Sequence, residues 1–245
     1  MGICKFCGKE KALIKAHIIP KNFYLNYKEQ GYKALNHDDG TCKLRQNGIY
    51  DNKNILCADC DGRILKKFDD EGYKILLSEI YNHVYDERNG DKIYHLEKTD
   101  FNYDLLRKFF ISILWRASIS PEKELYNINL GPYEEKAFEI IRGNAKHEHL
   151  FKILIFKAPK DAVFNHSVYI QPIKVLKNVN IYQIVMAGYD INIFLNSKKM
   201  CLQDYKIYNQ MFMSKEHLYI LESEMVDKDN QEYLFSYVKR WQKSR

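Results

Sequence analysis

Cysteines with metal-ligand spacing stand near the start of the chain, in two C-x-x-C pairs: Cys4 with Cys7 and Cys57 with Cys60. Two thiolates separated by two residues can bind one metal ion, and two such pairs complete the tetrahedral four-sulfur shell that Zn²⁺ prefers. Redox activity and burial in a core are the alternatives, but paired C-x-x-C motifs in an intracellular chain favour zinc. We therefore predict one structural Zn²⁺ site made of these four cysteines.

Length and composition indicate a soluble globular protein. The chain has 245 residues, 46% of them hydrophobic and 29% charged, which suits one large domain or two smaller ones. It has no apolar signal segment near the N-terminus and no run of about 18 apolar residues, so we expect a cytoplasmic location and no membrane span. Zinc takes four of the six cysteines, and we expect Cys42 and Cys201 to be ordinary thiols.

Positive charge is concentrated in the N-terminal part of the chain. Residues 1–68 contain 13 Lys and Arg against 7 Asp and Glu, a net charge of +6, whereas residues 69–245 contain 25 of each. Four cysteinates around one Zn²⁺ would lower the charge of the segment to about +4, which still favours a polyanionic partner. A basic surface that contacts only solvent is the alternative.

The elements between the cysteine pairs follow from apolar runs and turn residues. An apolar run from Ala12 to Ile19 predicts a strand that Pro20 ends, which leaves His17 at a strand end. Residues 21–47 are expected to form a loop with one helical turn, 48–52 a turn, and 54–56 a second strand. From Cys60 the apolar residues recur with a period near 3.6, which predicts a helix.

These residues resemble the HNH endonucleases of the ββα-metal, or His-Me finger, superfamily. The usual family form is a D-H-I-x-P strand followed by D-N-L-x-x-L-C-x-x-C-H entering a helix. This chain has A-H-I-I-P at residues 16–20 and D-N-K-N-I-L-C-A-D-C-D at 51–61. The resemblance, over roughly residues 1–80, implies hydrolysis of DNA phosphodiester bonds with Mg²⁺ or another divalent metal.

The resemblance also implies a role for each matching residue. His17 matches the general base, which takes a proton from the attacking water. Asn52 matches the asparagine that orients the histidine, and Asn54 is the alternative if the loop carries one extra residue. Asp61 stands where the family has a metal-binding histidine, and its carboxylate suits Mg²⁺. The alternatives are a histidine that supports the zinc loop, two turn asparagines, and a carboxylate favoured by the helix dipole.

Ala16 departs from the family pattern, because an Asp that binds the catalytic metal usually stands there. A methyl group cannot coordinate a metal, so Asp61 would need help from another acid of the helix. A second interpretation follows, in which the module has lost its catalytic metal and acts as a nucleic-acid or protein adaptor. The acids that could help are Asp59, Asp69, Asp70 and Glu71.

The sequence predicts an α+β protein with two domains. Residues 1–90 are expected to form a zinc-bound HNH-like nuclease module of ββα type, and residues 91–245 a mixed helix and antiparallel-sheet domain that recognises a partner. The boundary is placed in the charged, turn-forming segment 86–91. Helices are expected at 101–118, 132–141 and 232–242, and strands at 150–158, 167–173, 179–187, 189–195 and 218–222, with a hairpin at Gly188.

The expected partner is nucleic acid, with DNA indicated by the family resemblance. Because the excess positive charge is N-terminal, we expect the first domain to contact phosphates and the binding to weaken with salt. Trp115 and Arg116, within the predicted helix 101–118, are expected to pack in the core. The candidate phosphate partners are Lys15, Lys21, Lys43, Arg45, Arg63, Lys66 and Lys67.

Overall fold

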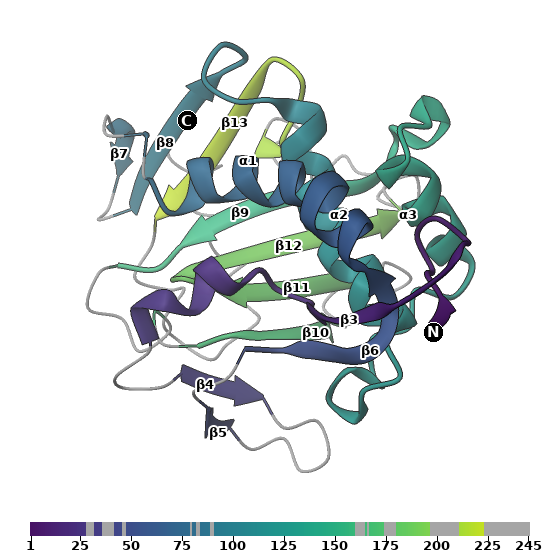
Figure 1. Cartoon of the computed structure of the whole chain (residues 1–245). Helices are drawn as coiled ribbons and strands as arrows, with labels where there is room; N and C mark the ends of the chain where they lie inside the picture. Colours follow the sequence, from purple (N-terminus) through teal and green to yellow (C-terminus); the bar gives the residue numbers. More distant parts are fainter. Residues whose placement is uncertain are drawn as a thin grey trace. The chain divides into compact units, whose positions relative to one another are not determined.

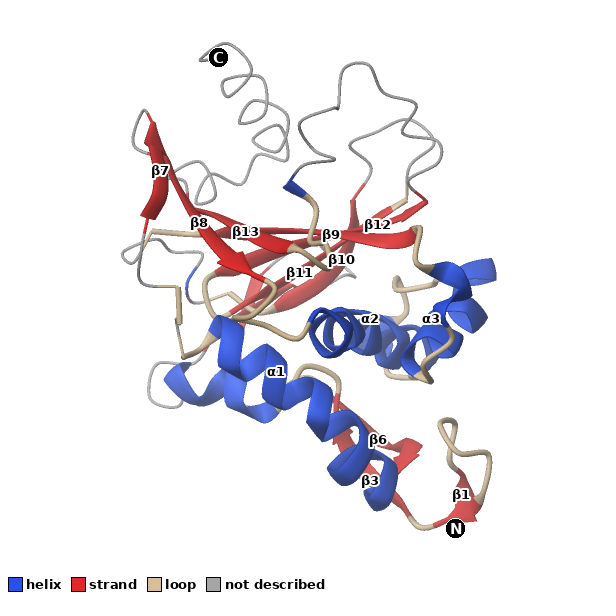
Figure 2. Cartoon of the chain, turned by 90° about the horizontal axis from the view of Figure 1, so that it is seen from above, coloured by secondary structure: helices blue, strands red, loops and turns tan. Residues whose placement is uncertain are grey.

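The computed structural model has a mixed α+β fold, which confirms the predicted class (Figures 1 and 2). No helix of the described part is long and apolar enough to cross a membrane. The predicted helix 232–242, Cys201 and the side chain of Cys42 lie outside this part. The structure describes residues 1–27, 32–35, 42–45, 48–78, 80–81, 84–88, 91–159, 165, 167–173, 180–196 and 211–222.

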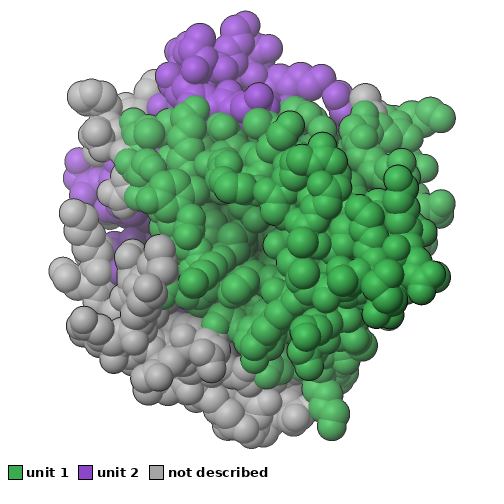
Figure 3. Space-filling view, viewed as in Figure 1, with its two compact units in different colours: residues 1–80, 104–147, 168–170 green, residues 81–103, 148–167, 171–245 purple. Residues whose placement is uncertain are grey.

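The chain divides into two compact units (Figure 3). Unit 1 comprises residues 1–80, 104–147 and 168–170, and unit 2 comprises residues 81–103, 148–167 and 171–245. This grouping differs from the expected division at residue 90, because the segment 104–147 belongs with the N-terminal part of the chain. Aromatic packing within unit 1 explains the difference.

The centre of unit 1 is helix α2, Tyr103–Ile119, which is apolar on nearly all sides and therefore buried. Phe109 of α2 stacks on Phe23 with a ring-centroid distance of 5.5 Å, and Trp115 stacks on Phe138 at 5.1 Å. A methyl group added at Gly72, on helix α1, would lie 2.5 Å from the Phe109 ring. Helix α2 thus packs against segments from both ends of unit 1.

The other elements of unit 1 are short. Two of its strands, β3 and β6, form an antiparallel pair, and the first turns of the next helix lie beside them (Figure 2). The bounds are β1 Gly2–Ile3, β2 Glu10–Lys11, β3 Leu13–His17, β4 Tyr32–Leu35, β5 Cys42–Arg45, β6 Tyr50–Cys57, α1 Lys66–Leu76 and α3 Glu134–Ile141, with a π-helix at Cys60–Leu65 and 3-10 helices at Lys21–Tyr27, Lys123–Leu125, Gly131–Tyr133 and Ala145–His147.

Unit 2 is built on a seven-stranded sheet in the order β10-β11-β12-β9-β13-β8-β7. The expected sheet was antiparallel, but β13 pairs with β9 in parallel. These two strands are far apart in sequence, so the connection is long enough for a parallel pairing. The bounds are β7 Val84–Arg88, β8 Asp91–Glu97, β9 Leu150–Lys157, β10 Tyr169–Ile173, β11 Ile181–Met186, β12 Tyr189–Asn196 and β13 His217–Glu222.

Two segments of the sheet, the turn at Gly188 and the charged residues 86–91, can be compared with the sequence-based expectations. The hairpin at Gly188 is confirmed, since Ala187 and Gly188 both have positive φ, as two-residue hairpin turns require. The charged segment that was expected to form turns contains residues 86–88 of β7 and Asp91 of β8, so its described residues belong to a strand pair. Strand β7 lies at the sheet edge, where charged side chains are tolerated and prevent pairing with other chains.

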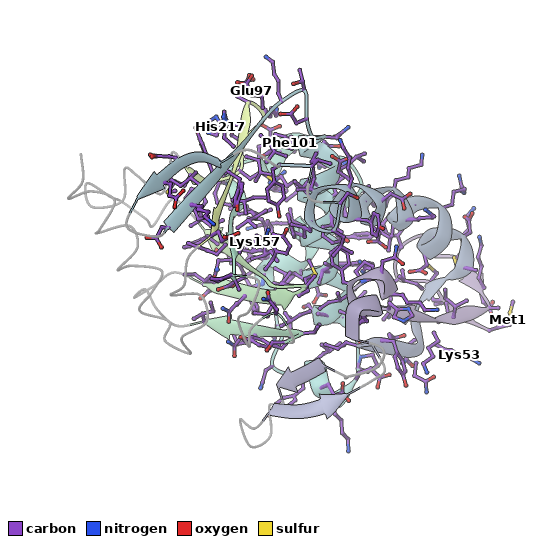
Figure 4. The ribbon with its side chains drawn as sticks, turned by 90° about the vertical axis from the view of Figure 1, so that its left-hand side faces the viewer. Met1, Lys53, Glu97, Phe101, Lys157 and His217 are labelled. Carbon is purple, nitrogen blue, oxygen red and sulfur yellow. The ribbon has the colours of Figure 1, made fainter. Side chains whose placement is uncertain are left out.

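Polar side chains form two groups in the sheet, one across neighbouring strands and one along β12. In the first group, Lys157 and Lys92 both pair with Glu222 between them, which Tyr94 also contacts through its hydroxyl (Lys157 is labelled in Figure 4). Along β12, Asn192 donates to Asp190, whose Oδ2 atom has no hydrogen-bond partner among the described residues. Burial raises the pKa of Asp190 to about 7.

Candidate functional site

The four predicted zinc ligands come together at the N-terminal end of unit 1. The sulfur atoms of Cys4, Cys7, Cys57 and Cys60 all lie within 4.8 Å of one another. A tetrahedral site with Zn–S bonds of about 2.3 Å requires S···S distances of about 3.8 Å. The cluster can therefore hold a metal ion such as Zn²⁺. Within the described part of the chain, no other three His, Cys, Asp or Glu side chains form such a group.

Tight backbone hydrogen bonds shape the first cysteine pair. The N–H of Gly8 donates to the carbonyl of Cys4 at 2.8 Å, and Gly8 has a φ of 69°, which a glycine adopts without strain. The N–H of Cys57 donates to Cys4 Sγ at 3.4 Å and links the two pairs. Between Cys4 and Cys7, the ring of Phe6 packs edge-on against Trp115 and Phe138, which anchors the loop to α2 and α3.

The thiols of the cluster differ in acidity. Burial opposes ionisation of Cys4, but hydrogen bonds from the backbone of Cys7, Cys57 and Phe6 lower its pKa to about 7. Burial, together with hydrogen bonds to the other thiols, raises the pKa of Cys60. A metal ion that binds all four sulfurs must therefore displace a proton from Cys60, and the affinity should increase with pH.

Strand β6 contains an irregularity where a turn was predicted. Ala16 pairs with Asp51 and Lys15 with Asn52, but the next pair is Leu13 with Cys57, so residues 53–56 bulge from the ladder. Lys53, labelled in Figure 4, has a φ of 66° within this bulge. Residues 50–52, predicted as part of a turn, thus belong to the strand, and the turn-forming asparagines lie in or next to the bulge.

A buried carboxylate, Asp51, organises the bulge. Its side-chain oxygens accept hydrogen bonds from the N–H groups of Asn54 (2.6 Å) and Ile55 (3.2 Å) and from Ser120 Oγ (3.1 Å). Asn54 Nδ2 donates to the same carboxylate at 3.1 Å. Sequence reasoning missed this role, although an Asp followed three residues later by Asn in a turn-like stretch is the signal of such a side-chain cap.

Neither candidate asparagine is hydrogen-bonded to the histidine in the described part of the chain. Asn54 binds Asp51, and the backbone N–H of Asn52 donates to Glu122 Oε1 at 2.9 Å. Both side chains are exposed. Asn52 nevertheless lies opposite Lys15 in the strand pair, and Lys15 stands two residues before His17. The side chains of Asn52 and His17 therefore lie on the same face of the two-stranded ribbon.

His17 is the last residue of β3, as predicted, and its side chain is half-buried. Its ring meets the ring of Tyr50 edge-on, with 6.4 Å between centroids. A methyl group added at Gly48 would lie 3.2 Å from His17 Cδ2, so this glycine leaves room for the imidazole. The carbonyl of His17 accepts a hydrogen bond of 2.9 Å from Arg116 Nη1.

The surroundings of His17 favour the neutral imidazole. Burial is the main cause that lowers its pKa below 6.5, while the charge of Asp61 opposes this effect. A neutral imidazole near pH 7 can accept a proton from a water molecule. The cations that add to the lowering are Lys21, Arg116 and Lys15.

Asp61 lies in the π-helix that follows the last cysteine, where its side chain is half-buried. Its charge acts on both His17 and Asp69, so the structure gathers these three groups in one region. Three other acids that were expected to help Asp61 bind a metal form ion pairs instead: Asp59 with Arg63, Asp70 with Lys66, and Glu71 with Lys74.

Asp69 also has a basic partner, but this one is buried. Arg116 Nη2 lies 3.3 Å from Asp69 Oδ1, and the Arg116 side chain is 1% exposed. Burial is the main cause that raises the pKa of Asp69, and Asp61 adds to it, while Arg116 acts in the opposite direction. Ala16, where the family would have a metal ligand, is fully buried.

The predicted phosphate partners have different surroundings. The ammonium of Lys15 lies 3.4 Å from the centre of the Tyr50 ring, and Lys21 and Lys67 are exposed. Arg63 and Lys66 form the ion pairs with acids of their own helical segment described above. The side chains of Lys43 and Arg45 lie outside the described part.

Comparisons of the chain with protein-family models, with curated proteins and with solved structures found no match. The resemblance to HNH endonucleases in residues 16–20 and 51–61 thus remains a prediction. Function has to be inferred from the cysteine cluster, the strand-end histidine and the charged groups around them.

Proposed function

We propose that the protein is a metal-dependent endonuclease of the HNH type that hydrolyses phosphodiester bonds of DNA. The observation that carries this proposal is the half-buried imidazole of His17, which sits at a strand end within electrostatic reach of Asp61 on the following helix. A base and a carboxylate in this relation are what hydrolysis by an activated water requires.

In this mechanism His17 accepts a proton from the water that attacks phosphorus. Its lowered pKa keeps the imidazole neutral and able to do so near pH 7. Asp61 would bind a divalent ion, and Mg²⁺ is often held by one or two carboxylates with waters and substrate phosphates completing its shell. Such an ion would stabilise negative charge on the scissile phosphate.

Zn²⁺ is the metal that we assign to the cysteine cluster, with a structural role. Its four ligands would fill the coordination shell and leave no position for substrate. Cys57 ends strand β6 and Cys60 begins the helical segment with Asp61, while Cys4 and Cys7 lie just before β3. The ion would therefore fix the strand end and the helix that carry the catalytic groups.

DNA is the substrate class that the charge distribution favours. The excess of positive charge in residues 1–68 would attract a polyanion, and Lys15 and Lys21 both act electrostatically on His17. Exposed lysines beside the base would contact the phosphates that flank the scissile bond.

A catalytically degenerate adaptor is the second candidate, and the pair of Arg116 and Asp69 favours it. Ala16 offers no metal ligand, and a buried guanidinium neutralises Asp69, the helix acid that shares the surroundings of Asp61. Such a module would keep the zinc and bind nucleic acid or protein without cleaving.

Plasmid nicking by the purified protein in Mg²⁺, Mn²⁺ and Ni²⁺ tests the proposal. His17→Ala should lower the rate by about 10²-fold or more, the usual contribution of a general base. Asp61→Asn should abolish cleavage in every metal, whereas Asp70→Asn, which changes an exposed acid on the adjoining helix α1, should cleave like the parent.

Zinc content is measured in each variant to show that the cluster is intact. Equal nicking by the parent and His17→Ala would exclude the catalytic role of this histidine. Salt-sensitive DNA binding without nicking in any metal would support the adaptor instead.

A further inference from the structure

Arg116 is a buried cation in an otherwise mostly apolar helix, and its guanidinium makes contacts with two other elements. Burial of a charge is unfavourable unless the charge is paired and hydrogen-bonded. Nη1 donates to the His17 carbonyl at 2.9 Å, Nη2 lies 3.3 Å from Asp69 Oδ1, and Nε donates to the carbonyl of Ser112 at 3.3 Å. Packing alone therefore does not account for this residue.

These contacts link the two parts of the candidate active site. The carbonyl of His17 belongs to the end of β3, and Asp69 lies on α1, which continues the π-helix that carries Asp61. A planar guanidinium holds its donors in a fixed geometry, so one side chain fixes the strand end relative to the helix.

We propose that Arg116 is the positioning residue of His17. It holds the backbone of the strand-end histidine and, through Asp69, the helix that carries Asp61, so that the imidazole and the Asp61 carboxylate keep their mutual position. The catalytic meaning of this role rests on the proposed nuclease function, but the positioning itself can be measured without catalysis.

The position of Arg116 also matters for the charge on the imidazole. The charged groups that act on His17 come from four elements: Lys15 from its own strand, Lys21 from the following 3-10 helix, Asp61 from the π-helix and Arg116 from α2. The Tyr50 ring of β6 packs against it as well. Both lysines are exposed and screened by water, whereas Arg116 is buried.

Arg107 provides a matched control on the same helix. It is also buried, and its Nη2 donates to a backbone carbonyl, that of His147, at 3.0 Å. Since that carbonyl is not part of the candidate site, Arg107→Gln should remove a comparable buried cation without affecting the site.

Amide hydrogen exchange of the zinc-loaded 245-residue chain tests the positioning. The N–H of Ile18, next to His17, donates to the carbonyl of Ile49, and the N–H of Lys5 donates to that of Ile55 near the metal cluster. Arg116→Gln should speed exchange at Ile18 at least about tenfold more than at Lys5, because it loosens the strand end locally. Arg107→Gln should leave the ratio of the two rates unchanged.

An equal acceleration at both amides in Arg116→Gln would show a general effect on stability and overturn the proposal. Arg116→Lys keeps the charge and is the second variant if the Gln variant loses its zinc. It should also raise the ratio of the two rates, because a single ammonium cannot make both contacts. An unchanged ratio in Arg116→Lys would overturn the proposal as well.

The pH profile of DNA cleavage adds a second readout. Arg116→Gln should move the acidic limb to higher pH, because a positive charge that lowers the pKa of His17 is lost, and Arg116→Lys should restore the limb. If the acidic limb of the pH profile stayed at the same pH in Arg116→Gln, the electrostatic effect of Arg116 on His17 would be contradicted. A parent that does not cleave DNA would refute the nuclease function, while the exchange ratio would still decide the positioning.

Discussion

Replacement of Asp51 by Ala should destabilise unit 1 strongly, although this residue lies in a stretch whose sequence reads as a turn. The carboxylate is 0% exposed and accepts four hydrogen bonds. Two of the donors, the N–H of Ile55 and Ser120 Oγ, make buried bonds that Ala cannot replace. A buried donor left unsatisfied costs about 1–3 kcal/mol, so we expect a loss of about 2–6 kcal/mol.

The matched variants separate the charge of Asp51 from its shape. Asp51→Asn keeps one acceptor oxygen and should cost less than Asp51→Ala. Asp70→Ala removes an exposed carboxylate whose ion pair with Lys66 is worth less than about 1 kcal/mol. The Asp70 variant therefore measures the effect of losing a surface carboxylate.

The assay is urea unfolding of the zinc-loaded protein, monitored in parallel by far-ultraviolet circular dichroism and by release of zinc to a chromogenic chelator. Zinc release reports on unit 1, because all four cysteines lie there. If Asp51→Ala shifted the zinc-release midpoint no more than Asp70→Ala, the carboxylate would not organise the bulge and the reasoning would be refuted.

Three further predictions concern packing, pH and the metal. Gly72→Ala should lower the free energy of unfolding in urea by about 1–3 kcal/mol, because its methyl group would overlap the Phe109 ring. Gly62→Ala has open space around it and should be neutral or stabilising, so equal effects of the two substitutions would contradict the prediction. Burial raises the pKa of Asp190 from 3.8 to about 7, so its contribution to stability should fall by about 4 kcal/mol between pH 4 and 7. Unfolding of Asp190→Asn should therefore depend on pH with a different slope from the parent, and an unchanged slope would argue against this. Cys57→Ser should abolish stoichiometric zinc by metal analysis and unfold unit 1, since zinc contributes on the order of 10 kcal/mol to small metal-bound modules; a folded variant that retains zinc would refute this.

Patterns that depend on local sequence predicted the corresponding features well. The C-x-x-C spacing correctly indicated that Cys4, Cys7, Cys57 and Cys60 come together, because each local pair supplies two sulfurs and a tetrahedral metal site needs a second pair. The continuous apolar run of α2 and the β-branched strands of the sheet also appear where expected. In the helix and the strands, the residues that decide the structure lie within one element.

Features that depend on distant partners could not be predicted. Arg116 was expected to pack in the core, and it is buried, but its contacts with His17 and Asp69 arise only when α2 is placed in unit 1. Asp51 likewise depends on Ser120, which is 69 positions away. Strand β7 was missed because its charged residues resemble a turn, and only its place at the sheet edge makes them compatible with a strand.

The cysteine cluster has a consequence for how the chain can vary. A metal ion bound there would close a covalent loop from Cys7 to Cys57, within which β4 and β5 form a two-stranded sheet of their own. The entropy of closing a loop rises slowly with its length, by about 0.6 kcal/mol for each doubling. A longer segment between Cys7 and Cys57 should therefore be tolerated, which makes this part of the chain a natural place to graft a new binding segment or a label while the metal centre stays intact.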